Sequence, residues 1–347
     1  MADWGTRPCV WRRFFLAAAG TAGFVTLAVY LFVVTVDPWD ALPLSPSLPR
    51  RPVTTAARYS LPMLARSPQF DSAVIGTSTM IQLNPNRLDP LFGAHFVNLA
   101  ILKATAYEQA RLLQVFLDAH PAPRFVMIGL DVRWCDPQPQ ARYTDYEFPE
   151  WLYEQVRWRG YLRMFNLFAV QEAGRQFWAV LGLKQAQHGI EDSFAYSEAD
   201  RRYDAVRARE KIVAEGMAPG PADPAAPVER FAYTTYHRLQ SALTAIPEGT
   251  RKLLVFVPFV LAYQGPEGSA TRAYWAECKR RISDLATRRS NVVVADFMIP
   301  SPITEDETNY FDVLHYRPKI ADQMAADLAR ASAGLPSTDG DYRLLTP

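Results

Sequence analysis

The side chains best suited to chemistry lie in two short segments near opposite ends of the chain. Residues 74–79 (VIGTST) form an apolar run that breaks at a glycine and presents Ser78. Residues 310–316 (YFDVLHY) contain Asp312 and His315. These are the groups that a Ser-His-Asp hydrolase or acyltransferase needs, provided that the fold brings them together. The sequence therefore predicts Ser78 as nucleophile, His315 as general base and Asp312 as the residue that orients the histidine.

The spacing of Asp312 and His315 fits these roles. Three residues apart, they can share one helical turn, so that the carboxylate reaches one imidazole nitrogen and leaves the other free to take a hydroxyl proton. Each motif also has an ordinary structural explanation, because a serine after a strand is commonly a turn residue or a helix cap and Asp-x-x-His is short. Their order in the chain and the α/β pattern around them favour the catalytic interpretation.

The strand that positions Ser78 is predicted over residues 70–75. Its apolar ending is typical of a parallel strand covered on both faces, and Gly76 permits a tight exit because it has no Cβ. Ser78 then lies at the carboxyl end of the strand, where open α/β sheets bind their ligands.

The rest of the chain alternates strands and helices, as parallel sheets do. A strand over 95–101, a helix over 107–119 and a strand over 125–131 predict a right-handed parallel crossover. The sheet resumes after an insertion, with strands over 252–260 and 291–297 and helices over 271–289 and 318–333. The predicted fold class is α/β with a mostly parallel sheet over residues 70–335, followed by a loose tail over 336–347.

The insertion covers about 136–250. It contains an aromatic-rich helical part over 151–183, a charged helix from Ser197 to about Glu215, and a proline- and glycine-rich loop over 217–227. For the aromatic side chains, ordinary core packing is favoured over a cofactor site. The insertion as a whole falls between strands, where α/β enzymes place lids and substrate-selecting elements, so a lid or a surface that meets the membrane or a partner is the expected use.

The N-terminal region carries the strongest topological signal. Residues 14–36 are apolar and uncharged, long enough to span a bilayer, with basic residues before them and Asp37 and Asp40 after them. The positive-inside rule then predicts residues 1–13 in the cytoplasm, an uncleaved anchor in the inner membrane and a periplasmic or otherwise extracytoplasmic main domain. Residues 37–69, rich in proline and arginine, are predicted to be a semi-extended linker.

Composition excludes several classes of function. The chain has 347 residues and a formal net charge of +1, and it has no basic tract, so nucleic acid is not an expected partner. No P-loop and no Gly-x-Gly-x-x-Gly occur, and the cysteines and histidines lack metal-ligand spacing, so neither cofactor nor metal is expected. Cys135 and Cys278 allow either one disulfide or two buried free thiols.

With these motifs placed, the chain resembles the SGNH (GDSL-like) hydrolase superfamily over about 70–333. The resemblance is to its membrane-anchored branch, which includes alginate O-acetyltransferase-like proteins and the D-alanyl-transfer protein of teichoic acid modification. It rests on Gly76-Thr77-Ser78-Thr79 as the first block and Asp312 to His315 as the last. The resemblance implies a three-layer sandwich, with Ser78, His315 and Asp312 as the catalytic triad.

The middle blocks depart from the family pattern. Lys103 stands where the family has a glycine whose N–H helps to form the oxyanion hole, and Asp131 stands in place of the third block's asparagine. A carboxylate cannot donate to an oxyanion unless it is protonated. One alternative is that the backbone N–H of Thr79 or Lys103 donates to the oxyanion. For Asp131 there are three alternatives: burial holds it neutral, it orients Lys103, or it only caps the end of its strand.

The leading hypothesis is a single-pass protein that transfers or removes an O-acyl group, with acetyl as the expected acyl group, on a cell-envelope polysaccharide. The resemblance favours transfer, beside a multipass acyltransferase partner. The alternative is a catalytically silent SGNH-like scaffold that binds glycan or that partner, which Lys103 and Asp131 motivate. A lipase of the α/β-hydrolase type fits less well because Met80 occupies the second glycine position of Gly-x-Ser-x-Gly.

Overall fold

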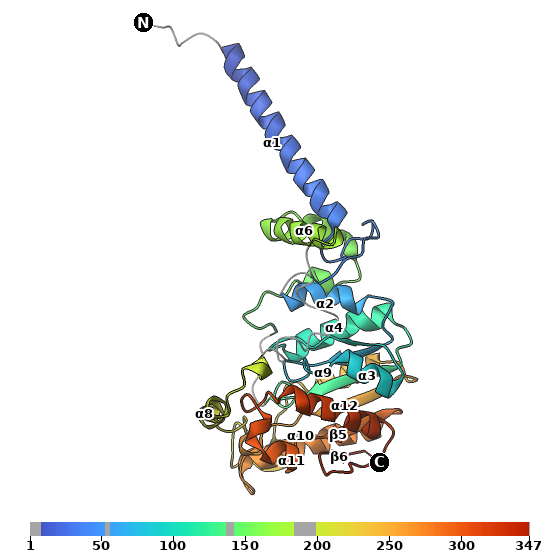
Figure 1. Cartoon of the computed structure of the whole chain (residues 1–347), viewed down its shortest axis with the longest axis vertical. Helices are drawn as coiled ribbons and strands as arrows, with labels where there is room; N and C mark the ends of the chain where they lie inside the picture. The colour runs from blue at the N-terminus through green and yellow to red at the C-terminus, as the bar shows by residue number, and fades with distance from the viewer. Residues whose placement is uncertain (1–7, 53–55, 137–141, 184–198, 347) are drawn as a thin grey trace. The chain divides into compact units, whose positions relative to one another are not determined.

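The computed structural model describes residues 8–52, 56–136, 142–183 and 199–346 (Figure 1). Arg7 of the predicted basic flank and Ser197, the predicted start of the charged helix, lie outside these ranges. The chain divides into two compact units, which are described separately. The first, here called the N-terminal unit, combines Met1–Thr55 with Val156–Gln187; the second, the α/β unit, combines Ala56–Gln155 with His188–Pro347.

The α/β unit is built on a six-stranded sheet of order β2-β1-β3-β4-β5-β6. The first five strands in this order are parallel, and β6 runs antiparallel to β5. Their bounds are β1 Ser72–Ile75, β2 Phe96–Asn98, β3 Phe125–Leu130, β4 Arg251–Phe256, β5 Val292–Asp296 and β6 Arg343–Leu344. Every residue of β1 and β3 is buried, as the apolar runs predict. The predicted α/β class with a mostly parallel sheet is confirmed.

The strand order places a topological switch point between the neighbouring strands β1 and β3. The chain leaves β1 toward β2 on one side and returns to β3 on the other. Open α/β sheets bind ligands beyond the carboxyl ends of strands at such a point. The segments that follow β1, β2 and β3 are therefore the natural place for a site, and they carry Ser78, Lys103 and Asp131 respectively.

Helices accompany the strands, and several begin where their sequence signals predict. Thr105 and Glu108 form a capping box at the start of α4, and Pro318 is the first residue of α12. Helix α4 packs with α2 and α9, and α12 packs with α3. The helix bounds in this unit are α2 Ala57–Ala65, α3 Pro85–Phe92, α4 Ala106–Ala119, α8 Ala205–Glu215, α9 Tyr236–Ala245, α10 Ala270–Thr287, α11 Pro302–Glu305 and α12 Pro318–Ser332.

Two segments that were expected to be irregular are ordered. Within the predicted linker, Ala57–Ala65 forms helix α2, whose residues from Arg58 onward are buried. The predicted loose tail instead adds β6, where the Arg343 guanidinium lies 3.0 Å from the buried Asp296 carboxylate on β5. The expectation failed because α2 contains Pro62 and β6 is too short to show any alternation.

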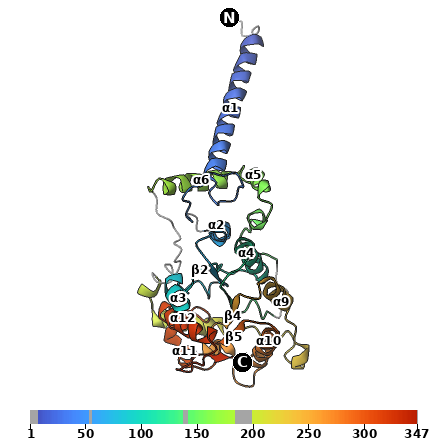
Figure 2. The ribbon, with the colours of Figure 1, turned by 90° about the vertical axis from the view of Figure 1, so that its right-hand side faces the viewer.

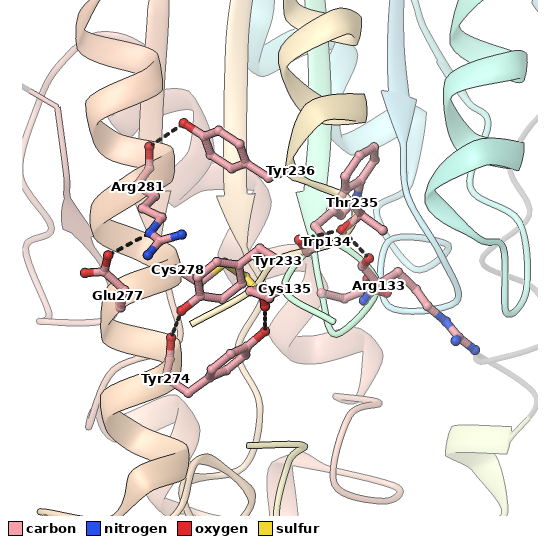
Figure 3. Close-up of a disulfide and its surroundings, with 12 residues drawn as sticks. Arg133, Trp134, Cys135, Tyr233, Thr235, Tyr236, Tyr274, Glu277, Cys278 and Arg281 are labelled. Atoms are coloured by element: carbon pink, nitrogen blue, oxygen red, sulfur yellow. Dashed lines mark hydrogen bonds and ion pairs between the residues drawn. A yellow bond between two sulfur atoms is a disulfide. The ribbon is translucent and has the colours of Figure 1, made fainter. Parts of the chain in front are cut away.

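A disulfide joins Cys135, just after β3, to Cys278 on α10 (Figure 3). It resolves the choice that the sequence left open. Around it, Tyr233 donates a hydrogen bond to the Tyr274 carbonyl at 2.7 Å, and the Thr235 hydroxyl donates to the Trp134 carbonyl at 2.9 Å. The segment that follows β3, which begins with Asp131, is thus held covalently to α10, and residues 233–235 are hydrogen-bonded to both.

The N-terminal unit contains helix α1 (Pro8–Val36) with the shorter α5 (Gly160–Arg163) and α6 (Leu167–Val180). Within the described ranges, α1 is the helix long and apolar enough to cross a membrane, and almost none of that stretch is buried. The helix is followed by Asp37, whose φ is 44° and whose carboxylate accepts hydrogen bonds from the Ala41 and Leu42 N–H groups, each at 2.9 Å. Helix α6 packs against α1, near its C-terminal end (Figures 1 and 2).

Candidate active site

Ser78 lies in a buried turn directly after β1. The Met80 N–H donates to the Thr77 carbonyl at 3.0 Å and the Ile81 N–H to the Ser78 carbonyl at 3.4 Å, so the chain coils tightly around the serine. The Ser78 residue is 7% exposed, so its hydroxyl lies just below the surface.

Two glycines make room for this turn. A Cβ on Gly76 would lie 2.8 Å from the Met80 Cβ, and a Cβ on Gly129 would lie 2.6 Å from the Met80 sulfur. Met80 is fully buried between them. Gly76 is therefore needed less for its own backbone freedom than for the close packing of Met80, two residues after the serine.

Asn98, at the end of β2, braces the same turn. Its Nδ2 donates to the carbonyls of Met80 at 2.8 Å and Leu83 at 2.9 Å, while its Oδ1 accepts from the Ala100 N–H at 3.0 Å. One amide thus ties the exit of β2 to the segment after β1. Sequence reasoning missed this residue; the available signal was an amide at the end of an apolar strand, where nothing local requires one.

Asp312 and His315 lie together in the loop before α12. The His315 Nδ1 lies 2.8 and 2.7 Å from the two Asp312 carboxylate oxygens, and the His315 Nε2 lies 2.8 Å from the Ser78 Oγ. The N–H groups of Leu314 and His315 donate to the Asp312 Oδ1, each at 2.9 Å. The three residues singled out from the sequence therefore form one continuous hydrogen-bonded chain, although the loop is a set of bends rather than the helical turn expected.

The loop is fastened directly to the serine turn. The Tyr316 hydroxyl donates to the Thr79 carbonyl, and the Gln82 side-chain amide donates to the Tyr316 carbonyl. Both side chains are buried. These two bonds fix the distance between segments that lie far apart in the sequence, and the sequence contains no local signal for either of them.

The electrostatics keep Asp312 ionised. Burial alone would raise its pKa, but hydrogen bonding and charge interaction with His315, together with the two backbone N–H groups, lower the pKa of Asp312 below its ordinary value. An ionised Asp312 holds the proton of the histidine on Nδ1 and leaves Nε2 as the acceptor that faces Ser78.

Lys103 occupies a tight turn after β2. Its φ is 56°, in the left-handed region that favours glycine, and the Ala104 N–H donates to the Ile101 carbonyl at 3.1 Å across the turn. The Lys103 side chain is exposed. The backbone conformation is thus one in which glycine would be unstrained, with the long side chain turned to solvent.

Asp131 lies at the end of β3 beside the serine turn and is buried. Its Oδ2 accepts a hydrogen bond from the Thr77 hydroxyl, and its Oδ1 accepts from the Arg133 N–H at 2.9 Å. Burial raises its pKa, while these hydrogen bonds act in the opposite direction. The Thr77 hydroxyl lies 3.4 Å from that of Thr79, so Asp131 is linked through Thr77 to the residues on both sides of Ser78.

A carboxylate from the insertion also lies near the triad. The pKa of Glu215, at the end of α8, lies above its ordinary value. Burial and then the nearby Asp312 raise it, and they outweigh a hydrogen bond from the Val313 backbone and the charge of His315. Close by, the Arg317 Nε donates to Asp200 at 2.6 Å and its guanidinium covers the Tyr203 ring at 3.9 Å. Sequence reasoning assigned this helix no part in the site.

The arrangement as a whole can activate a hydroxyl for attack on an acyl carbon. Among the described residues, no group of three or more His, Cys, Asp and Glu side chains is arranged to hold a metal ion. The chain matches no model of a known protein family, and it matches no curated protein.

Proposed function

We propose that this protein is an SGNH-like serine enzyme that transfers or hydrolyses O-acyl groups, chiefly acetyl, on a cell-envelope polysaccharide. The observation that carries the proposal is the chain Ser78 Oγ to His315 Nε2 to Asp312, with a step of 2.8 Å at the serine. In this proposal the α/β unit is a three-layer sandwich.

The reaction has two half-steps. His315 Nε2 takes the Ser78 proton as Oγ attacks the acyl carbonyl, and the imidazolium then gives that proton to the leaving oxygen. An acyl-serine results. In the second step His315 deprotonates water or a sugar hydroxyl, which attacks the acyl-serine, and the proton returns to Ser78. Water gives an esterase and a sugar hydroxyl gives a transferase; the backbone N–H groups of Thr79 and Lys103 are the oxyanion donors.

The proposed setting is the outer face of the cytoplasmic membrane. Helix α1 would span the bilayer with the N-terminus in the cytoplasm, and a multipass acyltransferase would supply the acyl group. The Cys135–Cys278 disulfide supports this compartment, because such bridges persist in oxidising surroundings and are rare in the cytosol.

The test is acyl release from p-nitrophenyl acetate by the detergent-solubilised full chain. Ser78→Ala and His315→Ala should each lower the rate by about 10³-fold or more. Matched controls are Ser241→Ala on α9 and the exposed His95→Ala, which should leave the rate unchanged. Acetyl found on an added oligosaccharide identifies transfer, and free acetate identifies hydrolysis. Equal rates in wild type and Ser78→Ala would refute the proposal.

A second candidate is a scaffold without catalysis, and Asp131 is the observation that favours it. As an acceptor from Thr77 and Arg133, its carboxylate gives the site no side-chain donor for an oxyanion. A scaffold predicts that Ser78→Ala leaves polysaccharide acylation in cells intact. Loss of acylation at normal protein levels excludes it.

A further inference from the structure

In helix α6 of the N-terminal unit, the distribution of polar and apolar side chains is the reverse of that in a helix that faces water. Its buried side chains are small or polar: Ala169, Glu172, Ala173, Gln176 and Ala179. The large apolar side chains of α6 and its flanks are exposed: Leu162, Phe165, Leu167, Phe177, Trp178 and Leu181. We call these six the apolar surface of the 156–183 segment. A water-facing helix normally shows the opposite distribution.

The buried polar side chains of α6 make their contacts within the unit. The Gln176 amide, oriented to satisfy both groups, pairs with the backbone N–H and carbonyl of Arg51 at 2.8 Å each. Glu172 lies 2.5 Å from the Arg175 guanidinium. These contacts determine which side of α6 faces the protein. The apolar side of the helix therefore faces outward.

The apolar surface lies beside the end of the apolar helix α1. The Tyr30 and Phe165 rings are 5.8 Å apart, and the Phe32 and Phe177 rings are 5.7 Å apart. The Tyr30 hydroxyl donates to the Tyr161 carbonyl at 3.0 Å. Because Tyr30 and Phe32 lie in the last two turns of α1, these contacts reach about 6–9 Å back along the helix from its end.

That depth corresponds to the boundary between lipid headgroups and acyl chains. Interfacial helices insert their apolar faces by about 5–10 Å, and tryptophan and tyrosine gather at this level. Basic side chains accompany the apolar surface: Arg159 and Arg163 are exposed on the same segment. Their charge suits lipid phosphates.

We infer that residues 156–183 form a second, interfacial membrane element, which lies in the outer leaflet beside α1. The occupant of the apolar surface is lipid, because the surface continues the lipid-facing side of a helix that is itself almost wholly exposed. The inference rests on α1 as a membrane span and is independent of the proposed chemistry. It gives the aromatic part of the insertion a use other than core packing.

The test is lipid quenching of a fluorophore on the full chain. A Cys9→Ser background, with the disulfide retained, carries an environment-sensitive label at Trp178→Cys or Leu167→Cys. A label at Val25→Cys in α1 reports the span. One at Val213→Cys on α8 is the control, because Val213 is as exposed as Leu167. Each protein is reconstituted at high lipid excess in phosphatidylethanolamine and phosphatidylglycerol vesicles that contain lipids spin-labelled near the headgroup or near the chain end.

We expect the labels at 178 and 167 to be quenched several-fold more by the shallow spin label than by the deep one and to resist aqueous iodide. The label at Val213 should be quenched by aqueous iodide. Labels at 178 and 167 that remain open to iodide, while Val25 is quenched by the deep label, would overturn the inference and point to a protein partner on this surface. An unquenched Val25 would refute the span and the inference together, whatever the esterase activity of the preparation.

Discussion

The buried carboxylate of Asp131 gives a prediction about the rate of the proposed reaction. In the proposed enzyme we expect an ionised Asp131, buried next to Thr77, to oppose the negative charge that develops on the acyl oxygen, because like charges repel strongly where water is excluded. We expect Asp131→Asn to retain the Arg133 contact through its amide oxygen and to raise kcat for p-nitrophenyl acetate by about tenfold at pH 8.

The pH dependence follows from the raised pKa of Asp131. As the pH falls toward this pKa, the wild-type carboxyl gains a proton and the advantage of Asp131→Asn should shrink. Parallel pH–rate profiles of the two proteins measure this. A variant slower than wild type at every pH would show that the ionised carboxylate assists the reaction.

Lys103 allows the effects of its backbone conformation and of its side chain to be tested separately. Glycine removes the strain of a positive φ, so Lys103→Gly should raise the free energy of unfolding by about 0.5–1 kcal/mol in urea denaturation, whereas Lys103→Ala should not. Both variants keep the N–H group, so both should retain ester hydrolysis. If both lost activity, the ammonium group rather than the backbone would be the donor.

At the scale of elements, the sequence predicted those that depend on local pattern. The apolar runs predicted β1, β3, β4 and β5, and the order of Ser78 and Asp-x-x-His predicted which side chains would meet. The bracing by Asn98 and Gln82 could not be predicted, since each side chain binds backbone carbonyls supplied by another segment. Strand β6 was missed for the same reason: its stability comes from pairing with β5 and not from its two residues.

The contact between α12 and the tail should depend on pH. Burial, and then the nearby Asp341 and Asp339, raise the pKa of Asp327 to about 6. Since the folded-state pKa lies above the unfolded value, the stability from protonated Asp327 is fully present below about 3.8 and is lost as the pH rises through about 6.

Asparagine reproduces the neutral form of Asp327 at any pH. Asp327→Asn should therefore be more stable than wild type by about 1 kcal/mol at pH 8, after allowance for solvent screening, and equally stable at pH 4. Thermal unfolding at the two pH values measures the difference. Asp322→Asn, on the exposed side of α12, is the matched control and should show no such gain. A difference that did not change with pH would contradict the assignment.

At the scale of the whole molecule, the disulfide links regions 143 residues apart in sequence. Closing so long a loop constrains the unfolded chain, so Cys278→Ser should lower the free energy of unfolding by about 2–4 kcal/mol. Reductant should lower the free energy of unfolding of the wild type to that of the variant and leave the value for the variant unchanged. A wild-type Tm indifferent to reductant would contradict the bridge.

Covalent labelling shows whether His315 activates the Ser78 hydroxyl. A fluorophosphonate probe reacts with serines whose hydroxyl is activated by a base, and peptide mass spectrometry locates the adduct. The full chain should be labelled at Ser78, and neither His315→Ala nor Ser78→Ala should be labelled there. An unlabelled Ser78 in the wild type, or equal labelling of wild type and His315→Ala, would contradict the account.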